Sequence, residues 1–303
     1  MNKLKKISLG IFVAFIIIVM SILIRGQLLV NTYYCIKGHS SNEIRIVALA
    51  DLHGRKFGKN QNYIIKKIEY VNPDIIVYVG DMIERNRIET SLESVIMLTK
   101  GLVEIAPVYY VDGNHELDAS VIEPNKYYNY NQKMKELGAV RLENEIVSLK
   151  YGNAKINICG ITAHYSWGDL EEQLIETIKS MEGINVMLCH YPETVLWNKP
   201  FNGGGLDVAI CGHTHGGLIR VPFKGGVYAP EYGFWPMYVL GEYPIYTDTR
   251  SRDYGGHKGA QFLGTMIISG GLSGEHHIPR INNPCEISVI DIKGKFFYKQ
   301  LYY

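Results

Sequence analysis

The chain has 303 residues, of which 47% are hydrophobic and 20% are charged, and its formal net charge is +1. This length allows one large domain or two small ones, and the composition is typical of a folded protein. The near-neutral charge argues against a nucleic-acid binder that depends on neutralising phosphates, so we expect no nucleic-acid partner. The five cysteines include no C-x-x-C pair, which excludes a zinc ribbon or a thioredoxin-type motif.

The first feature along the chain is Ile7–Ile24, a run of 18 residues without a charged side chain. As a helix it would be about 27 Å long, which is close to the hydrocarbon thickness of a bilayer. Three lysines precede the run, and only Arg25 follows it closely. By the positive-inside rule we expect the N-terminus in the cytoplasm and the rest of the chain outside. A cleaved signal peptide is the alternative interpretation, but no convincing cleavage site follows the run.

This reading divides the chain into three expected segments. Residues 1–30 would be a cytoplasmic tip and a transmembrane signal anchor, residues 31–43 a short linker, and residues 44–303 one domain. The domain would lie on the extracytoplasmic side of the cell membrane, held by a single pass. No internal repeat, low-complexity tract or Ser/Pro-rich linker divides it further, and we expect it to be monomeric.

Beyond residue 40, short apolar runs alternate with amphipathic segments. The expected strands are Ile44–Ala50, Ile75–Val79, Val108–Val111, Ile156–Ile161, Val186–Cys189, Val208–Cys211, Met266–Ile268 and Ile287–Ile292. The expected helices are Tyr63–Val71, Leu92–Ile105, Lys126–Leu137 and Leu170–Met181. The β-α-β-α-β order of the first half is typical of an α/β layered fold.

One segment, from Phe223 to about Phe262, breaks this alternation. It is rich in Gly, Pro and aromatic residues, and we expect a long loop or an irregular insertion. Its aromatic side chains form either a bilayer-facing or substrate-stacking platform, or they pack the loop onto the domain.

Polar side chains follow five of the expected strands directly. They are Asp51 and His53, Asp81, Asn114, His190, and the pair His213 and His215. In open α/β sheets, ligands bind outside the carboxyl ends of the strands. Each residue alone could be a turn, cap or rim residue, but five coincidences of one type favour a shared site.

The donors of this set are oxygen and imidazole, without a thiolate. This mixture suits zinc, manganese or iron better than calcium or an iron–sulfur cluster. Seven ligands are too many for one tetrahedral ion and suit two ions that share a bridging carboxylate. Such a pair can clamp an in-line displacement at phosphorus and turn water into hydroxide near neutral pH.

The ordered motifs of the chain resemble those of a known family. DLH, GDMIE, GNHE, the histidine of CHYPE and GHTHGG, in this order over residues 44–218, are similar to the motifs of the calcineurin-like metallophosphoesterase superfamily. GHTHGGLIRVP, followed by VYAP, FWPMY and NPCEISVI, resembles its bacterial branch of membrane-anchored or exported phosphodiesterases. The resemblance implies a four-layer sandwich of two mixed β-sheets flanked by helices, here preceded by one transmembrane helix.

The resemblance also implies roles for the matching residues. One metal would be bound by Asp51, His53 and His215, the other by Asn114, His190 and His213, and Asp81 would bridge both. His115 would lie beside the substrate, as general acid for the leaving oxygen or as a charge partner of the phosphoryl group. Glu116 would orient that imidazole or a neighbouring ligand. Arg55 and His164 are further candidates for contacts with the substrate.

The implied function is a membrane-anchored phosphoesterase with two divalent or mixed-valence transition metal ions, Mn, Zn or Fe. It would hydrolyse phosphodiester or phosphomonoester bonds through a metal-activated hydroxide, and a lipid-linked or cell-envelope substrate fits the anchor. The alternatives are a nuclease or a cyclic-nucleotide phosphodiesterase of the same superfamily. A non-catalytic scaffold with the same fold is a further alternative, although such a protein would be expected to have lost some of the ligands.

Overall fold

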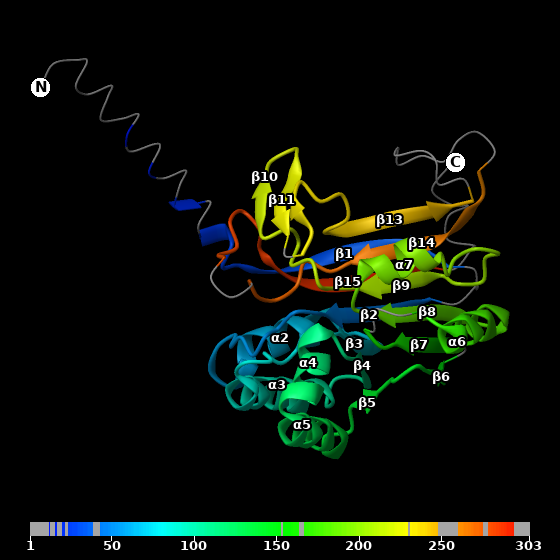
Figure 1. Cartoon of the computed structure of the whole chain (residues 1–303), viewed down its shortest axis with the longest axis horizontal. Coiled ribbons are helices and arrows are strands. Elements are labelled where there is room, and N and C mark those ends of the chain that lie inside the picture. Colours follow the sequence, from blue (N-terminus) through cyan, green and yellow to red (C-terminus); the bar gives the residue numbers. More distant parts are fainter. Residues whose placement is uncertain are drawn as a thin grey trace, which may run out of the picture.

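Two six-stranded sheets, flanking helices and a separate three-stranded sheet make up the fold of the computed structural model (Figure 1). The structure describes residues 12, 16, 20, 21, 24–38, 43–152, 154–163, 167–229, 231–247, 260–274 and 278–293.

The first sheet contains the strands of the N-terminal half together with the last strand of the chain. In spatial order they are β1 (Leu29–Lys37), β15 (Cys285–Lys293), β2 (Ile44–Leu49), β3 (Ile75–Val79), β4 (Val108–Val111) and β5 (Val140–Arg141). Strands β2 to β5 run parallel, β15 is antiparallel to β2, and β1 is parallel to β15.

Helices cover the outer face of this sheet (Figure 1). They are the short 3-10 helix η1 (Lys59–Gln61), α2 (Asn62–Val71), α3 (Ile88–Leu102), α4 (Asn114–Ile122) and α5 (Pro124–Glu136). In α2, Ile64, Ile68 and Val71 are buried at the spacing of one helical face. They share a core with Val47 of β2 and Ile76 of β3.

The second sheet contains the later strands. In spatial order they are β13 (Gly241–Tyr246), β14 (Phe262–Ile268), β9 (Val208–Cys211), β8 (Ile184–Cys189), β7 (Ala154–Ile161) and β6 (Glu145–Tyr151). The four inner strands run parallel, and β13 and β6 are antiparallel to their neighbours. Helices α6 (Asp169–Ser180) and α7 (Pro192–Asn198) share a separate core with this sheet.

A third core joins the two sheets face to face. Val77 of β3 and Ile46 of β2 are fully buried there with Val186 of β8 and Ile210 of β9. Because these strands are covered on both faces, their sequences are apolar except for Arg45 and Asn185 and do not alternate. The mixed α/β fold with two mixed sheets and flanking helices, expected from the sequence, is confirmed.

The N-terminal segment differs in part from its expected organisation. Residues 31–37 of the expected linker form most of β1, which pairs with β15 along its whole length. The transmembrane helix expected over Ile7–Ile24 falls mostly outside the described residues. Within the described part of the chain, no helix is long and apolar enough to cross a membrane.

The aromatic-rich segment is more regular than expected. Strands β10 (Ile219–Val221), β11 (Gly225–Ala229) and β12 (Gly233–Phe234) form the three-stranded sheet, and β13 follows. Phe223, Phe234 and Trp235 are exposed on it, whereas Tyr243 is buried and its hydroxyl accepts a hydrogen bond from Val239 N at 3.2 Å. The segment therefore contains both outward-facing aromatics and aromatics that pack onto the domain.

Candidate metal centre

The chain leaves several strands of both sheets in a strained conformation. Asp51 and His53 after β2, Asp81 after β3, and His213 and His215 after β9 have φ angles of +53°, +46°, +55°, +72° and +50°. Residues other than glycine rarely adopt this left-handed backbone conformation, and strained residues of this kind are concentrated at functional sites. Five of the seven expected metal ligands therefore occupy backbone positions that local sequence preference alone does not explain.

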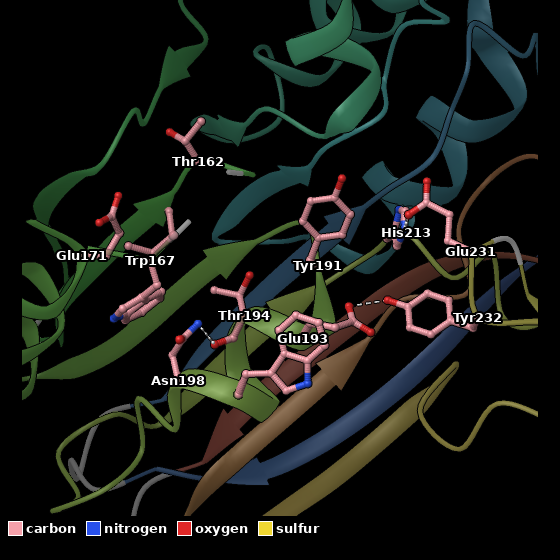
Figure 2. Close-up of a pocket in the computed structure, with 12 residues that line it drawn as sticks. Thr162, Trp167, Glu171, Tyr191, Glu193, Thr194, Asn198, His213, Glu231 and Tyr232 are labelled. Atoms are coloured by element: carbon pink, nitrogen blue, oxygen red, sulfur yellow. Dashed lines mark hydrogen bonds and ion pairs between the residues drawn. The ribbon is translucent and has the colours of Figure 1, made fainter. Parts of the chain in front are cut away.

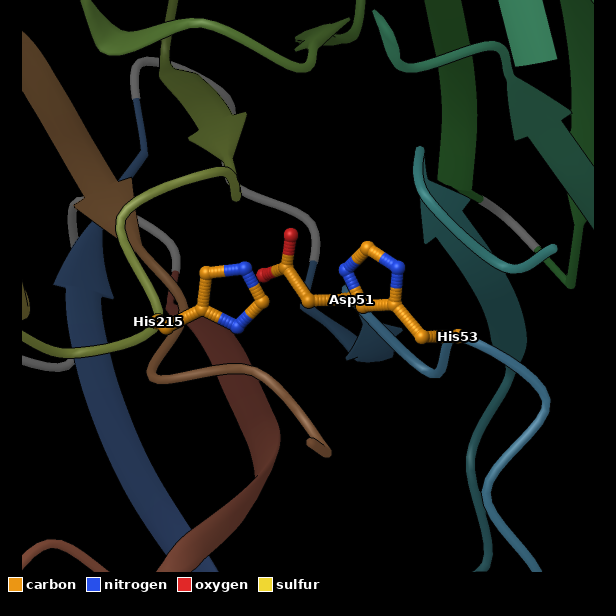
Figure 3. A group of neighbouring side chains, drawn as sticks. All are labelled: Asp51, His53 and His215. Atoms are coloured by element: carbon orange, nitrogen blue, oxygen red, sulfur yellow. The ribbon is translucent and has the colours of Figure 1, made fainter. Parts of the chain in front are cut away.

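The first group of donors consists of Asp51, His53 and His215. One ligand atom of each lies within 4.8 Å of the others, and Figure 3 shows the Asp51 carboxylate between the two imidazoles. The His53 and His215 rings stack with their centroids 5.2 Å apart. His215 Nδ1 lies 3.0 Å from Ser273 O. Because a carbonyl oxygen only accepts, Nδ1 carries the proton, and the lone pair of Nε2 is available to a metal ion.

The second group consists of Asp81, His190 and His213, whose ligand atoms also lie within 4.8 Å of one another. His190 Nε2 is 3.2 Å from Asp81 Oδ2 and 3.1 Å from Asn114 Oδ1. Its other nitrogen, Nδ1, is 2.7 Å from Val79 O, which fixes the ring. Asn114 therefore joins this group, and the structure brings all seven expected ligands together in two neighbouring clusters.

Asp81 connects the two clusters. Its Oδ2 is 3.2 Å from His190 Nε2 in the second group and 3.9 Å from His53 Nε2 in the first. Burial opposes ionisation of Asp81, but the His190 and His115 imidazoles outweigh it and hold the pKa of Asp81 well below its ordinary value. A carboxylate in this position can face two cations at once.

Buried polar atoms test whether metal ions fit this site. Among the described residues, Asp51 Oδ2 and His53 Nε2 are buried without a hydrogen-bond partner. Such atoms are costly in a folded protein unless something pairs with them. Because both are lone-pair donors of the kind that Zn, Mn and Fe accept, the residues present fit a transition metal ion.

Two glycines allow the close approach of the ligand-bearing loops. At Gly80, where φ is +92°, an added Cβ would lie 2.4 Å from His190 Nδ1. At Gly113, an added Cβ would lie 2.2 Å from Asp81 Oδ1. The glycines of the GD and GNH motifs are therefore required by space, and at Gly80 also by backbone conformation.

His115 lies at the side of His53, with ring centroids 4.4 Å apart in an edge-to-face arrangement. Its Nδ1 is 3.1 Å from Glu84 Oε1, and its Nε2 is 4.0 Å from Asp81 Oδ2. Burial disfavours its charged form, but Asp81 and Glu84 outweigh it and raise the pKa of His115 to about 9. These two carboxylates therefore favour the protonated form of the imidazole.

Glu84 was given no role by the sequence, although it ends the GDMIE motif. Its second oxygen, Oε2, is 3.3 Å from His53 Nδ1, so one buried carboxylate contacts both His53 and His115. Burial raises the pKa of Glu84, but the two imidazoles outweigh it and lower the pKa well below its ordinary value. The signal in the sequence was its position three residues after Asp81, in the same loop.

Glu116 is a positioning residue. It is buried, and its two oxygens accept hydrogen bonds of 2.8–3.0 Å from the backbone N–H groups of Asp81, Met82, Ile83 and Gly113. These bonds fix the loop that carries Asp81 against the start of α4. Glu116 thus fixes the backbone of Asp81, an expected ligand, whereas the carboxylate that contacts the His115 imidazole is Glu84.

Arg280 is a second residue that sequence reasoning missed. Its buried guanidinium donates to Ser273 O at 2.7 Å and to the carbonyls of Gly270, Asn283 and Pro284. Ser273 O is also the partner of His215 Nδ1. Arg280 therefore orients the carbonyl that orients His215, and the contact between Ser273 and His215 joins residues for which the sequence carries no local signal.

The two expected substrate contacts remain predictions. The Arg55 guanidinium donates to Gln27 Oε1 at 3.0 Å and to Cys285 Sγ at 3.1 Å, and lies over the Phe57 ring. The position of the Arg55 guanidinium is therefore accounted for by contacts within the chain. His164 lies outside the described residues.

The family model described as calcineurin-like phosphoesterase matches residues 44–217, which include all seven expected ligands. The chain belongs to this family. Its motifs therefore identified the superfamily correctly, and in this family a centre of two divalent metal ions is typical.

Three curated bacterial relatives of this phosphoesterase are each 27% identical to it. The uncharacterized protein YpbG of Bacillus subtilis matches over 64% of the chain and 70% of its own length. The uncharacterized metallophosphoesterase Cj0846 of Campylobacter jejuni matches over 84% of the chain and 60% of its own length. The phosphodiesterase YaeI of Escherichia coli matches over 61% of the chain and 66% of its own length. The chain thus spans about two thirds of the length of these relatives.

Proposed function

We propose that this chain is a two-metal phosphoesterase that hydrolyses phosphodiester bonds, with phosphomonoesters as the second candidate substrate. The observation that carries the proposal is the position of Asp81 Oδ2, 3.2 Å from a histidine of one cluster and 3.9 Å from a histidine of the other. All seven expected ligand residues are present and lie close together, which argues against a non-catalytic scaffold.

Two divalent or mixed-valence ions, Mn, Zn or Fe, would supply activated water and neutralise negative charge on the phosphoryl oxygens. The chain's own residues would hold them in the arrangement that the motifs imply. Asp51, His53 and His215 form one half, and Asn114, His190 and His213 form the other. Asp81 belongs to both.

His115 has the geometry of a general acid. Glu84 holds its Nδ1, which directs Nε2 toward Asp81 and the space between the clusters. From there a protonated imidazole can donate its proton to the oxygen of the leaving alcohol, or stay protonated and pair with the phosphoryl group. Glu116 fixes the loop of Asp81 during the reaction through its backbone hydrogen bonds.

Preference for diesters and a place at the membrane are the finer parts of the proposal. The relative from Escherichia coli is named a phosphodiesterase, and its similarity supports the same class here. The uncharged run Ile7–Ile24 and the exposed side chains Phe223, Phe234 and Trp235 support a domain held at the extracytoplasmic face of the membrane. A nuclease or cyclic-nucleotide phosphodiesterase remains an outcome of the test.

The test is an activity panel on full-length protein reconstituted with Mn, Zn or Fe. We expect hydrolysis of bis-p-nitrophenyl phosphate at a higher kcat/KM than p-nitrophenyl phosphate, and loss of both on chelation. Glycerophospholipids, cyclic nucleotides and DNA complete the panel. Absence of hydrolysis of every ester with every metal would contradict the proposal, and a clear preference for DNA or cyclic nucleotides would replace it with the alternative.

A further inference from the structure

A cavity of about 610 Å³ adjoins the proposed metal centre on the side of α6 and α7 (Figure 2). His213, one of the proposed ligands, is among its lining residues. A group held in the cavity can therefore be covalently attached to a phosphate at the centre. The volume is in the range of about 300–1,000 Å³ that small-molecule sites have.

Aromatic side chains form much of the cavity wall. Trp167, Tyr191, Trp197 and Tyr232 line it. The Tyr191 and His213 ring centroids are 4.5 Å apart, and those of His213 and Tyr232 are 5.7 Å apart, so the aromatic wall begins at the metal centre. The faces of such rings attract cations, with Trp the strongest.

The charged side chains of the cavity are acidic. Glu171, Glu193 and Glu231 line it, whereas the described lining residues include neither Lys nor Arg. Glu193 Oε2 accepts a hydrogen bond from the Tyr232 hydroxyl, a contact that Figure 2 marks with a dashed line. Glu231 Oε2 lies 3.2 Å from His213 Nε2. Free phosphate or a polyphosphate would be repelled by this set of carboxylates.

We propose, building on the function above, that this cavity binds an ammonium-bearing organic group that is one of the two ester substituents of the substrate. A positive charge flanked by aromatic rings and a carboxylate is the arrangement that proteins use for quaternary and primary ammonium groups. His115 packs on His53, on the side of the first sheet. The other ester substituent leaves on that side, while the cation stays in the cavity.

The experiment compares two diesters with the same leaving group. p-Nitrophenyl phosphorylcholine carries the cation, and 3,3-dimethylbutyl p-nitrophenyl phosphate replaces its quaternary nitrogen with carbon at the same size. In each, water adds to phosphorus, the P–O bond to p-nitrophenolate breaks, and the second substituent stays on the phosphate. We expect kcat/KM to be about tenfold higher for the cationic ester. Equal values, or a preference for the neutral ester, would overturn the inference.

Charge in the cavity is tested with Glu193→Gln, which keeps an acceptor for Tyr232 and removes the negative charge. The ratio of the two kcat/KM values should fall at least fivefold in this variant. Glu176→Gln is the matched control, because Glu176 is exposed on α6 and pairs with Lys179 away from the cavity. An unchanged ratio in Glu193→Gln would contradict the role of the carboxylate.

Failure of this inference and failure of the proposed function give different results. Hydrolysis of both esters without a preference contradicts the cation site alone, and faster hydrolysis of the p-nitrophenyl ester of thymidine 5′-phosphate would assign the cavity to a nucleoside instead. Calorimetric titration with phosphocholine and 3,3-dimethylbutyl phosphate makes the same comparison without turnover. Phosphocholine should bind about tenfold more tightly, and equal affinities would overturn the inference even in a protein that hydrolyses neither ester.

Discussion

Replacement of Glu116 by Gln tests how the ligand loops are held together. The two carboxylate oxygens accept four backbone hydrogen bonds, two on each oxygen, from the Asp81 loop and Gly113. Gln has the same shape, but it places an NH₂ group where one of these oxygens stands. Two buried N–H donors then lose their acceptor and face another donor.

The size of the effect follows from these two bonds. A buried donor left without a partner costs about 1–3 kcal/mol, so two of them cost about 2–6 kcal/mol. The whole free energy of unfolding of a domain is about 5–15 kcal/mol. Glu116→Gln should therefore remove a large fraction of the stability, and it should also weaken metal binding through the displaced Asp81.

The assay is urea unfolding of the metal-free protein, because bound metal would add its own linkage to the native state. We expect a lower midpoint with an unchanged m-value. Glu136→Gln is the control, since Glu136 is exposed on α5 and pairs with Lys133; its effect should stay within about 0.5 kcal/mol. If the free energy of unfolding of Glu116→Gln stays within the same margin of the wild type, the four backbone hydrogen bonds do not hold the Asp81 loop.

Three further predictions address the site and its support. His115→Ala should keep two metal ions per chain by elemental analysis and lose about 10²–10⁴ in kcat, and undiminished hydrolysis would remove the general-acid role. Arg280→Met should lower metal affinity about 10–100-fold in a chelator competition, because His215 loses the fixed carbonyl of Ser273, and unchanged affinity would show that this carbonyl is held otherwise. Asp291→Asn should reduce the free energy of unfolding by about 1 kcal/mol at pH 7. A hydrogen bond from Arg45 holds the pKa of Asp291 below its ordinary value of 3.8, so this stabilisation is present above about that pH and disappears as the pH falls through the folded-state value; a difference independent of pH would contradict it.

The parts of the fold that could be predicted from sequence are those with a strong local pattern. β3 and β9 are short apolar runs covered on both faces, and a polar residue follows each of them after a single glycine. α2 has its buried residues on one face. Polar residues at the ends of five expected strands predicted one shared site. Asp81 and His213 follow strands of different sheets, however, so their meeting depends on how the two sheets pack against each other.

The missed elements depend on partners far away in the chain. β1 alternates poorly, and its strand conformation is fixed by pairing with β15, about 250 residues later. β6 is a largely exposed edge strand without an apolar run. Glu84 likewise acquires its role only when its loop folds back on His115. Arg280 acquires its role only when the Ser273 carbonyl that it holds meets His215. No local periodicity or motif spacing contains that information.

The function proposed for Asp81 is to join two metal ions through one carboxylate, and elemental analysis of the purified chain measures whether it does. After reconstitution with Mn²⁺ and removal of free metal, the wild type should contain two ions per chain. Asp81→Asn should lose occupancy at both positions together, because Asp81 faces both clusters. One ion per wild-type chain, or two ions retained in Asp81→Asn, would contradict the claim.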